Sequence, residues 1–295
     1  LRQLGRFSLL TGLSDGHRLP IALTAMDRTK MTVPRVHASK DSGTPLAMIT
    51  AYDAPFASIV DEAGVDMILV GDSVGTVMQG QRTTIPVSME EMEYHVRMVA
   101  SARPKALIVG DMPFGSYQAD SADAVRNAVR LMKAGAECVK LEGGVNVAER
   151  VAAIVKADIP VIGHIGLTPQ SYHRMGGNRI QGRTSGDSAG SRERLIEDAH
   201  SVEQAGAFAV VIEGVPSRLA AEITEKVSIP TIGIGAGSSC NGQVLVLHDV
   251  LGLSPRKLSF AKPYANLHEM SIDAVRRYAT EVRRGTWPDE AHSFD

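Results

Sequence analysis

Aromatic residues and cysteine are both scarce in this sequence. Aromatic side chains make up 4% of the 295 residues, and the formal net charge is -2. Proteins that bind nucleic acid usually present a basic surface, so we expect no nucleic-acid partner. The two cysteines, Cys138 and Cys240, lie far apart and in no metal-ligand spacing, which argues against a disulfide framework and a zinc site. A reducing cytoplasm fits this usage, and we expect no membrane association because no apolar run reaches the length of a membrane span.

The N-terminal segment differs from the rest of the chain. Residues 1–25 carry three arginines against a single aspartate, and the first residue is Leu1. Arginine-rich, acid-poor segments are typical of organellar targeting peptides. The alternative is an upstream stretch that precedes a start at Met26 or Met31. We expect residues 1–28 to form a poorly ordered extension outside the fold.

From residue 46 onward, short apolar runs alternate with segments of helical periodicity. The runs expected as strands are 46–50, 67–70, 106–109, 138–141, 160–163, 208–212, 231–234 and 244–247. The segments expected as helices are 54–63, 89–102, 121–135, 145–156, 192–206 and 217–227. Such alternation implies parallel strands that are joined by helical crossovers.

The number of strands decides between two architectures that share this alternation. Eight units over about 200 residues predict a (β/α)8 TIM barrel, which we assign to residues 29–266. A doubly wound open sheet is the competing architecture, but no GxGxxG motif follows the first strand. Residues 267–295 are expected to form a C-terminal helix and tail that pack on the barrel or on a neighbouring subunit.

Ionisable and hydroxyl side chains follow most of the predicted strands. In chain order they are Tyr52, Asp72 and Ser73, Asp111, Lys140 and Glu142, His164, and Glu213. In a parallel barrel these positions meet at one rim, where the βα loops gather and catalytic groups project. Burying so many charges unpaired would be costly. We therefore expect them to pair with one another or to hold a metal ion.

The residue types indicate individual roles. Asp72 and Asp111 suit an octahedral Mg2+ that also takes waters and a substrate chelate, although each aspartate alone could instead cap a helix. Lys140 could form a Schiff base, but Glu142 two positions away should keep it protonated and suited to binding a carboxylate.

Four further features bear on the site, and two of them, His164 and the glycine-rich loop, have two interpretations each. His164 is either a substrate ligand or a satisfied core histidine. Glu213 follows an apolar strand, an environment that suits a general base. Asp53 precedes Ala54-Pro55 and is better explained as a helix cap. The glycine-rich loop at 233–237 is either an anion cradle or a tight loop.

Nine motifs, in order, resemble one known family. They are TAYDAPFA, LVGDSVG, TTIPVSMEEM, DMPFGSY, VKLEGG, GHIGLTPQS, IQGR, VIEGVP and IPTIGIGAG. Together with the terminal EAHSF, they make the chain similar to the 3-methyl-2-oxobutanoate hydroxymethyltransferase family, also called ketopantoate hydroxymethyltransferase. The resemblance implies a (β/α)8 barrel of the phosphoenolpyruvate/pyruvate superfamily type that assembles as a homo-oligomer, namely a decamer.

The resemblance also implies a reaction. The family transfers a hydroxymethyl group from 5,10-methylenetetrahydrofolate to 3-methyl-2-oxobutanoate and forms 2-dehydropantoate for pantothenate and coenzyme A synthesis, with Mg2+ as cofactor and Mn2+ or Co2+ as alternatives. Matched by motif, Asp72 and Asp111 are implied to bind the metal directly, and Glu142 through a water. Ser73 and Lys140 are implied to bind the substrate, which Asp72 and Asp111 meet through the metal, while Tyr52 and His164 line the pocket. Glu213 is implied to abstract the proton. The enzymatic alternative is a metal-dependent aldolase or carbon–carbon lyase acting on a 2-oxo acid. A non-catalytic scaffold or ligand-binding barrel is the alternative of a different class.

Overall fold

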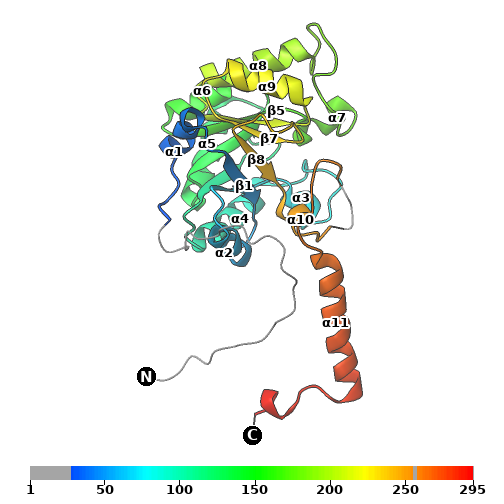
Figure 1. Cartoon of the computed structure of the whole chain (residues 1–295). Helices are drawn as coiled ribbons and strands as arrows, with labels where there is room; N and C mark the ends of the chain where they lie inside the picture. The colour runs from blue at the N-terminus through cyan, green and yellow to red at the C-terminus, as the bar shows by residue number, and fades with distance from the viewer. Residues whose placement is uncertain (1–27, 255–257, 295) are drawn as a thin grey trace.

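Eight parallel strands form a closed barrel in the order β1 to β8 (Figure 1). The structure is a computed structural model that describes residues 28–254 and 258–294. The expectation for the N-terminal extension therefore falls outside the described residues, apart from residue 28. The strands are β1 (Leu46–Thr50), β2 (Met67–Val70), β3 (Leu107–Asp111), β4 (Cys138–Glu142), β5 (Val161–Gly166), β6 (Ala209–Glu213), β7 (Thr231–Ile234) and β8 (Gly242–Leu245). The predicted TIM barrel is confirmed.

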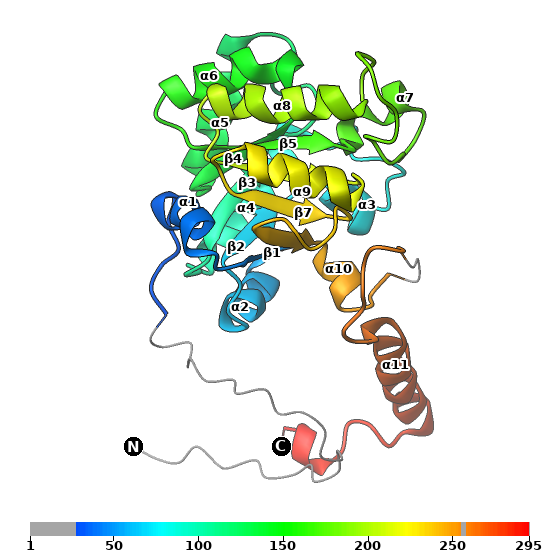
Figure 2. The same ribbon diagram turned by 45° about the horizontal axis from the view of Figure 1, so that its top comes forward.

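Helices cover most of the outer wall of the barrel (Figure 2). They are α1 (Val33–Ser42), α2 (Ala54–Glu62), α3 (Val74–Val77), α4 (Met89–Ser101), α5 (Ser121–Ala134), α6 (Ala148–Lys156), α7 (Tyr172–Met175), α8 (Arg192–Gln204), α9 (Ser217–Lys226), α10 (Leu247–Val250) and α11 (Leu267–Arg284), with short 3-10 turns η1 (Val145–Val147), η2 (Pro169–Ser171) and η3 (Glu290–His292). The predicted helices agree with this list to within a few residues. None of the described helices is long and apolar enough to cross a membrane.

Two apolar layers stabilise the barrel. The interior layer contains side chains from the strands, among them Leu46, Met67 and Val211, and the outer layer lies between strands and helices. Helix α1, which the sequence did not predict, places Val36 in the interior layer with no exposed surface. It thereby covers the amino-terminal end of the barrel, opposite the rim that was expected to carry the polar residues.

Local capping explains where several helices begin and end. Helix α4 has a capping box in which Ser88 and Glu91 each bond to the other's backbone N–H. Helix α5 ends at Gly135, whose φ of 115° lies in the left-handed region that glycine adopts readily. Asp53 caps α2, because its Oδ1 accepts a hydrogen bond of 2.8 Å from the backbone N–H of Phe56. The cap interpretation of Asp53 is confirmed.

The connection from β7 to β8 contains no helix. Residues 235–241 pass directly between the two strands, and within them Gly237 has a φ of 82°. A Cβ at Gly237 would lie 2.5 Å from the Cβ of Ser217, so close packing requires glycine there. This contact favours the tight-loop interpretation of the glycine-rich segment. Because residues 235–241 form no helix, part of the outer wall beside β7 and β8 has no covering helix among the described residues.

Helix α11 extends away from the barrel (Figures 1 and 2). Its first residues are tied to the end of α10 by hydrogen bonds from the N–H groups of Leu267 and His268 to the carbonyls of Leu251 and Gly252. Beyond that attachment the helix has no buried residue.

We expect Asp53→Ala to lower the free energy of unfolding by about 1 kcal/mol, because a helix N-terminus loses its side-chain acceptor. Urea unfolding followed by circular dichroism measures the change. Asp53→Ser is the matched control, since serine also caps helices and should retain most of the stability. Equal stability of the alanine variant and the native chain would contradict the capping role.

Candidate active site

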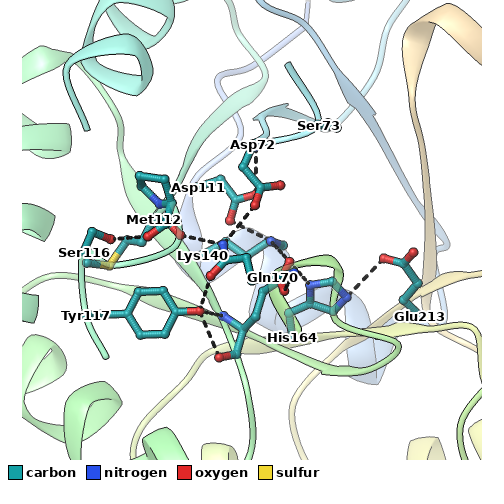
Figure 3. A network of polar contacts seen from close by, with 12 residues as sticks. Asp72, Ser73, Asp111, Met112, Ser116, Tyr117, Lys140, His164, Gln170 and Glu213 are labelled. Atoms are coloured by element: carbon teal, nitrogen blue, oxygen red, sulfur yellow. Dashed lines mark hydrogen bonds and ion pairs between the residues drawn. The ribbon is translucent and has the colours of Figure 1, made fainter. Parts of the chain in front are cut away.

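The register of the strands brings the predicted polar residues together at the carboxyl-terminal rim. Asp111 on β3 is the register partner of Lys140 on β4, and Glu142 is the partner of His164 on β5. Glu213 ends β6 next to the end of β5. These side chains converge on one another in a continuous polar network (Figure 3). Parallel strands therefore deliver groups that are up to about a hundred residues apart in sequence to one place.

Lys140 occupies the centre of a buried group of acids. Its Nζ lies 2.6 Å from Asp111 Oδ1 and 3.7 Å from Glu142 Oε1. Burial alone would lower the pKa of Lys140, but the nearby charges of Asp111, Glu142 and Asp72 raise it above its ordinary value. The ammonium form is therefore favoured, as the sequence predicted from the spacing of Lys140 and Glu142. A Schiff-base role, which needs a neutral amine, is not favoured.

The group has more negative than positive charge. Asp72 and Asp111 are linked by a hydrogen bond of 3.1 Å from the backbone N–H of Asp72 to Asp111 Oδ2. Burial, together with the charges of Asp111 and Glu142, raises the pKa of Asp72 to about 8. Three buried carboxylates thus face the ammonium of Lys140 and the imidazole of His164, and the raised pKa of Asp72 shows that either a proton or a cation is favoured at its carboxylate.

His164 lies between two carboxylates. Its Nδ1 is 3.3 Å from Glu142 Oε1 and its Nε2 is 3.2 Å from Glu213 Oε2. Neither contact has the geometry of a hydrogen bond, so we describe both as ion-pair contacts. Burial and Lys140 lower the pKa of His164, but Glu142 and Glu213 raise it to about 9. His164 therefore connects Glu213, which is partly exposed, to the buried acids.

Tyr52 and Ser73 add two hydroxyl groups to the rim. The Tyr52 hydroxyl and Ser73 Oγ are 2.8 Å apart, and Ser73 directly follows Asp72 in the chain. The carbonyl of Tyr52 lies 2.8 Å from Nδ1 of the buried His95. Both hydroxyls are thus held beside the acidic group, where a small anionic substrate could meet them.

The donor set fits a divalent cation that keeps water ligands. No group of three His, Cys, Asp or Glu side chains in the described part of the chain is arranged to hold a metal ion without other ligands. Mg2+ is commonly bound by one or two carboxylates plus waters and substrate oxygens, which matches Asp72 and Asp111. Burial, and then the charges of Asp111 and Glu142, raise the pKa of Asp72, and a bound cation would counter both effects by stabilising the ionised carboxylate. The oxygens of Glu142 already contact His164, Lys140 and the backbone N–H of Gln170, which suits contact with a metal through water.

Gln170 and Tyr117 belong to the same network, and the sequence did not predict either. Gln170 Nε2 donates to Asp72 Oδ2 at 2.9 Å, and the Tyr117 hydroxyl donates to Gln170 Oε1 at 2.6 Å. Both residues stand inside quoted motifs, GHIGLTPQS and DMPFGSY. A glutamine or a tyrosine in a loop does not by itself indicate a functional site. The available signal was that both residues lie within motifs of the family.

Two cavities lie outside the network. One of about 290 Å3 adjoins Gly166 at the end of β5 and is bordered by Asn146, Arg174, Arg194 and Asp198. The other, of about 530 Å3, lies on the outer wall and is lined by Leu46, Gly237, Gly242 and Phe260, among others. The second cavity lies at the part of the wall beside β7 and β8 that none of the described helices covers.

A closed parallel barrel with charged groups at its carboxyl-terminal rim defines a TIM-barrel enzyme. Among solved structures it is similar to a phosphonopyruvate hydrolase in complex with oxalate and Mg2+, with a TM-score of 0.57, 15% identity, and coverage of 90% of this chain and 92% of that one. It is also similar to 2,3-dimethylmalate lyase, a member of the PEP mutase/isocitrate lyase superfamily, with a TM-score of 0.57, 17% identity, and coverage of 92% and 93%. At these identities the similarity shows the fold alone, a closed (β/α)8 barrel.

The sequence comparisons define the family. The model of ketopantoate hydroxymethyltransferase matches residues 30–290. The 3-methyl-2-oxobutanoate hydroxymethyltransferase of Trichlorobacter lovleyi is 54% identical over 269 residues, covering 90% of this chain and 99% of that protein. The protein of the same name from Ignicoccus hospitalis is 53% identical over 263 residues, covering 89% and 98%. The chain therefore belongs to the ketopantoate hydroxymethyltransferase family, as its motifs predicted.

We expect Lys140→Met to lower the free energy of unfolding by about 3 kcal/mol in the presence of EDTA, because it leaves buried carboxylates without their cation. Urea unfolding measures the change. Lys133→Met removes an exposed lysine from α5 and should change stability by less than about 0.5 kcal/mol. If both variants unfold at the same urea concentration as the native chain, the ammonium of Lys140 does not stabilise the acidic group.

Proposed function

We propose that this chain transfers a hydroxymethyl group from 5,10-methylenetetrahydrofolate to 3-methyl-2-oxobutanoate, forming 2-dehydropantoate. The observation that carries the proposal is the buried group of Asp72, Asp111 and Lys140, which combines a cation site with a fixed positive charge. A 2-oxo acid needs both features, because its carboxylate and keto oxygens can chelate a cation while its negative charge is offset. Family membership supplies the identity of the two substrates.

Asp72 and Asp111 would hold Mg2+, and Glu142 would hold a water on it; Mn2+ and Co2+ have the same donor preference for this site. When bound, the ion withdraws electrons from the keto group and stabilises the negative charge that develops there. Lys140 lies beside Asp111 and offsets the charge of the substrate carboxylate. Ser73 and Tyr52 orient the same end of the substrate through their hydroxyls.

Glu213 is the proposed general base. It lies at the end of β6, its carboxylate is partly exposed, and Nε2 of His164 is 3.2 Å from its Oε2. Glu213 takes the C3 proton of the keto acid, and the electron pair that is released forms a bond from C3 to the one-carbon unit of the folate. Both C–N bonds from that carbon to the folate break, and water supplies the hydroxyl oxygen. The two folate nitrogens take up the C3 proton and the remaining proton of the water, so that tetrahydrofolate leaves. His164 orients Glu213 and links it to Glu142.

The proposal is tested by following the C3 proton of 3-methyl-2-oxobutanoate by NMR in D2O, with Mg2+ and without folate. We expect the native chain to exchange this proton for deuterium and EDTA to stop the exchange. We expect Glu213→Gln to slow exchange by about 10²–10⁴-fold, since the glutamine cannot accept a proton. Binding of the keto acid should change little, because Glu213 does not hold its charged end.

Glu225→Gln, on the exposed side of α9, is the matched control and should exchange at the native rate. Addition of 5,10-methylenetetrahydrofolate should then yield 2-dehydropantoate. Unchanged exchange in Glu213→Gln would remove Glu213 as the base. Exchange or carbon–carbon cleavage with no dependence of product on the folate would favour the lyase alternative.

We further propose that the enzyme acts in the cytoplasm as a homo-oligomer, the decamer that the family resemblance implies. Both cysteines are free and buried, as suits a reducing compartment. Helix α11 supports the oligomer, because Ile272, Val275, Tyr278 and Val282 form an exposed apolar stripe on it. A second copy of the chain is the proposed occupant, since its outer wall beside β7 and β8 has an uncovered groove with Phe260 at its edge.

We expect light scattering to give a mass about ten times the 31.5 kDa of one chain. Val275→Asp should shift the mass towards smaller species, because it places a charge in the proposed interface. Arg276→Asp, on the next residue and also exposed, is the control for a charge change outside the stripe. A native chain that is monomeric, or a Val275→Asp variant of native mass, would contradict this role for α11.

A further inference from the structure

Gln170 contacts several members of the polar network, although the proposed reaction assigns it no role. It lies in η2, directly after β5, and is almost fully buried. Its backbone N–H donates to Glu142 Oε2 at 2.9 Å. Its side-chain amide donates to Asp72, which lies two residues after the end of β2 (Figure 3). One neutral residue therefore connects two of the three carboxylates, which follow or end different strands.

The contacts determine which way the amide of Gln170 faces. Nε2 lies 2.9 Å from the carbonyl oxygen of Met112 and 2.9 Å from Asp72 Oδ2, and a carbonyl can only accept. Oε1 lies 2.6 Å from the Tyr117 hydroxyl and 3.2 Å from Nε2 of Gln118. Every hydrogen-bonding group of the amide is thus satisfied in one orientation. A flipped amide would face a carbonyl with its own oxygen.

This arrangement has a consequence for Asp72. A hydrogen bond to Oδ2 limits the rotation of the carboxylate, which would otherwise turn away from the charge of Asp111 and Glu142. Because Gln170 is neutral, it orients Asp72 without cancelling the negative charge that a cation needs. A lysine or arginine at the same place would cancel that charge.

We propose that Gln170 is a positioning residue that orients Asp72 for a divalent cation and that Tyr117 fixes the orientation of its amide. The inference rests on the proposed function, since it assigns the cation to Asp72 and Asp111. Partners that orient metal ligands in this way commonly change metal affinity by about 10–100-fold when they are removed.

The test measures Mn2+ binding to the full-length chain by electron paramagnetic resonance without keto acid or folate. Gln170→Met retains the length of the side chain but has no amide. We expect it to raise the Kd for Mn2+ by about 10–100-fold. The concentration of Mg2+ that half-saturates C3 proton exchange should rise by a similar factor, while the exchange rate at saturating Mg2+ stays within about threefold of native. A residue with a structural role alone would lower the melting temperature and leave the Kd unchanged.

Two further variants keep the test decisive. Tyr117→Phe should weaken Mn2+ binding by a smaller factor, about threefold to tenfold, because the amide loses a donor but remains in place. If Gln170→Met does not fold, the Kd of Tyr117→Phe for Mn2+ tests the inference in its place. Gln118→Leu is the matched control: it removes the other contact to Oε1 and should leave the Kd within about twofold of native. A folded Gln170→Met variant with a Kd within about twofold of native would overturn the inference.

Failure of this inference and failure of the proposed function give different results. If the native chain binds Mn2+ and the Asp72→Asn variant does not, but the native chain fails to exchange the C3 proton, the proposed function is refuted and the role of Gln170 still holds. If the native chain exchanges the proton and the Gln170→Met variant binds Mn2+ as tightly as the native chain, this inference alone is refuted. No Mn2+ binding by the native chain would also overturn it.

Discussion

The buried ion pair between Lys140 and Asp111 is the interaction around which the rim of the barrel is organised. Its 2.6 Å contact joins β3 to β4 at the point where the two strands end. Even with the ammonium in place, burial and the neighbouring carboxylates raise the pKa of Asp72 to about 8. Without the ammonium, the other buried carboxylates would be driven towards protonation as well. A divalent cation would stabilise the ionised form of these carboxylates instead. Fold stability and cation binding therefore depend on the same few charges.

The rim combines rigid and adjustable parts. The buried acids are held by backbone N–H groups and by the amide of Gln170, so their positions are set by the strands and by η2. Glu213 is partly exposed, and its Oε2 contacts Nε2 of His164. A base that must approach a substrate carbon benefits from such freedom, whereas metal ligands benefit from fixed orientation.

Most of the fold could be predicted from the sequence, because apolar runs and helical periodicity alternate clearly in it. The strand ends also indicated the site, since Asp72, Asp111 and Glu213 each follow a run that can fill a buried strand. Helix α1 was missed because its sequence, VPRVHASKDS, is mainly polar and its role is to cover the barrel with Val36. Gln170 was missed for a different reason: hydrogen bonds between loops and strands depend on the closed barrel and leave no periodic signal in the chain.

The pairing of β1 with β8 has a consequence for how this chain folds. Leu46 pairs with Gly242, whereas the other neighbouring strands are joined by short stretches of sequence. Closing so long a loop is entropically costly, and contacts of large sequence separation form slowly. The seam between the first and last strands should therefore be the last to form and the first to open. It lies next to the part of the wall without a covering helix, so local unfolding should begin there rather than at the rim that carries the charged groups.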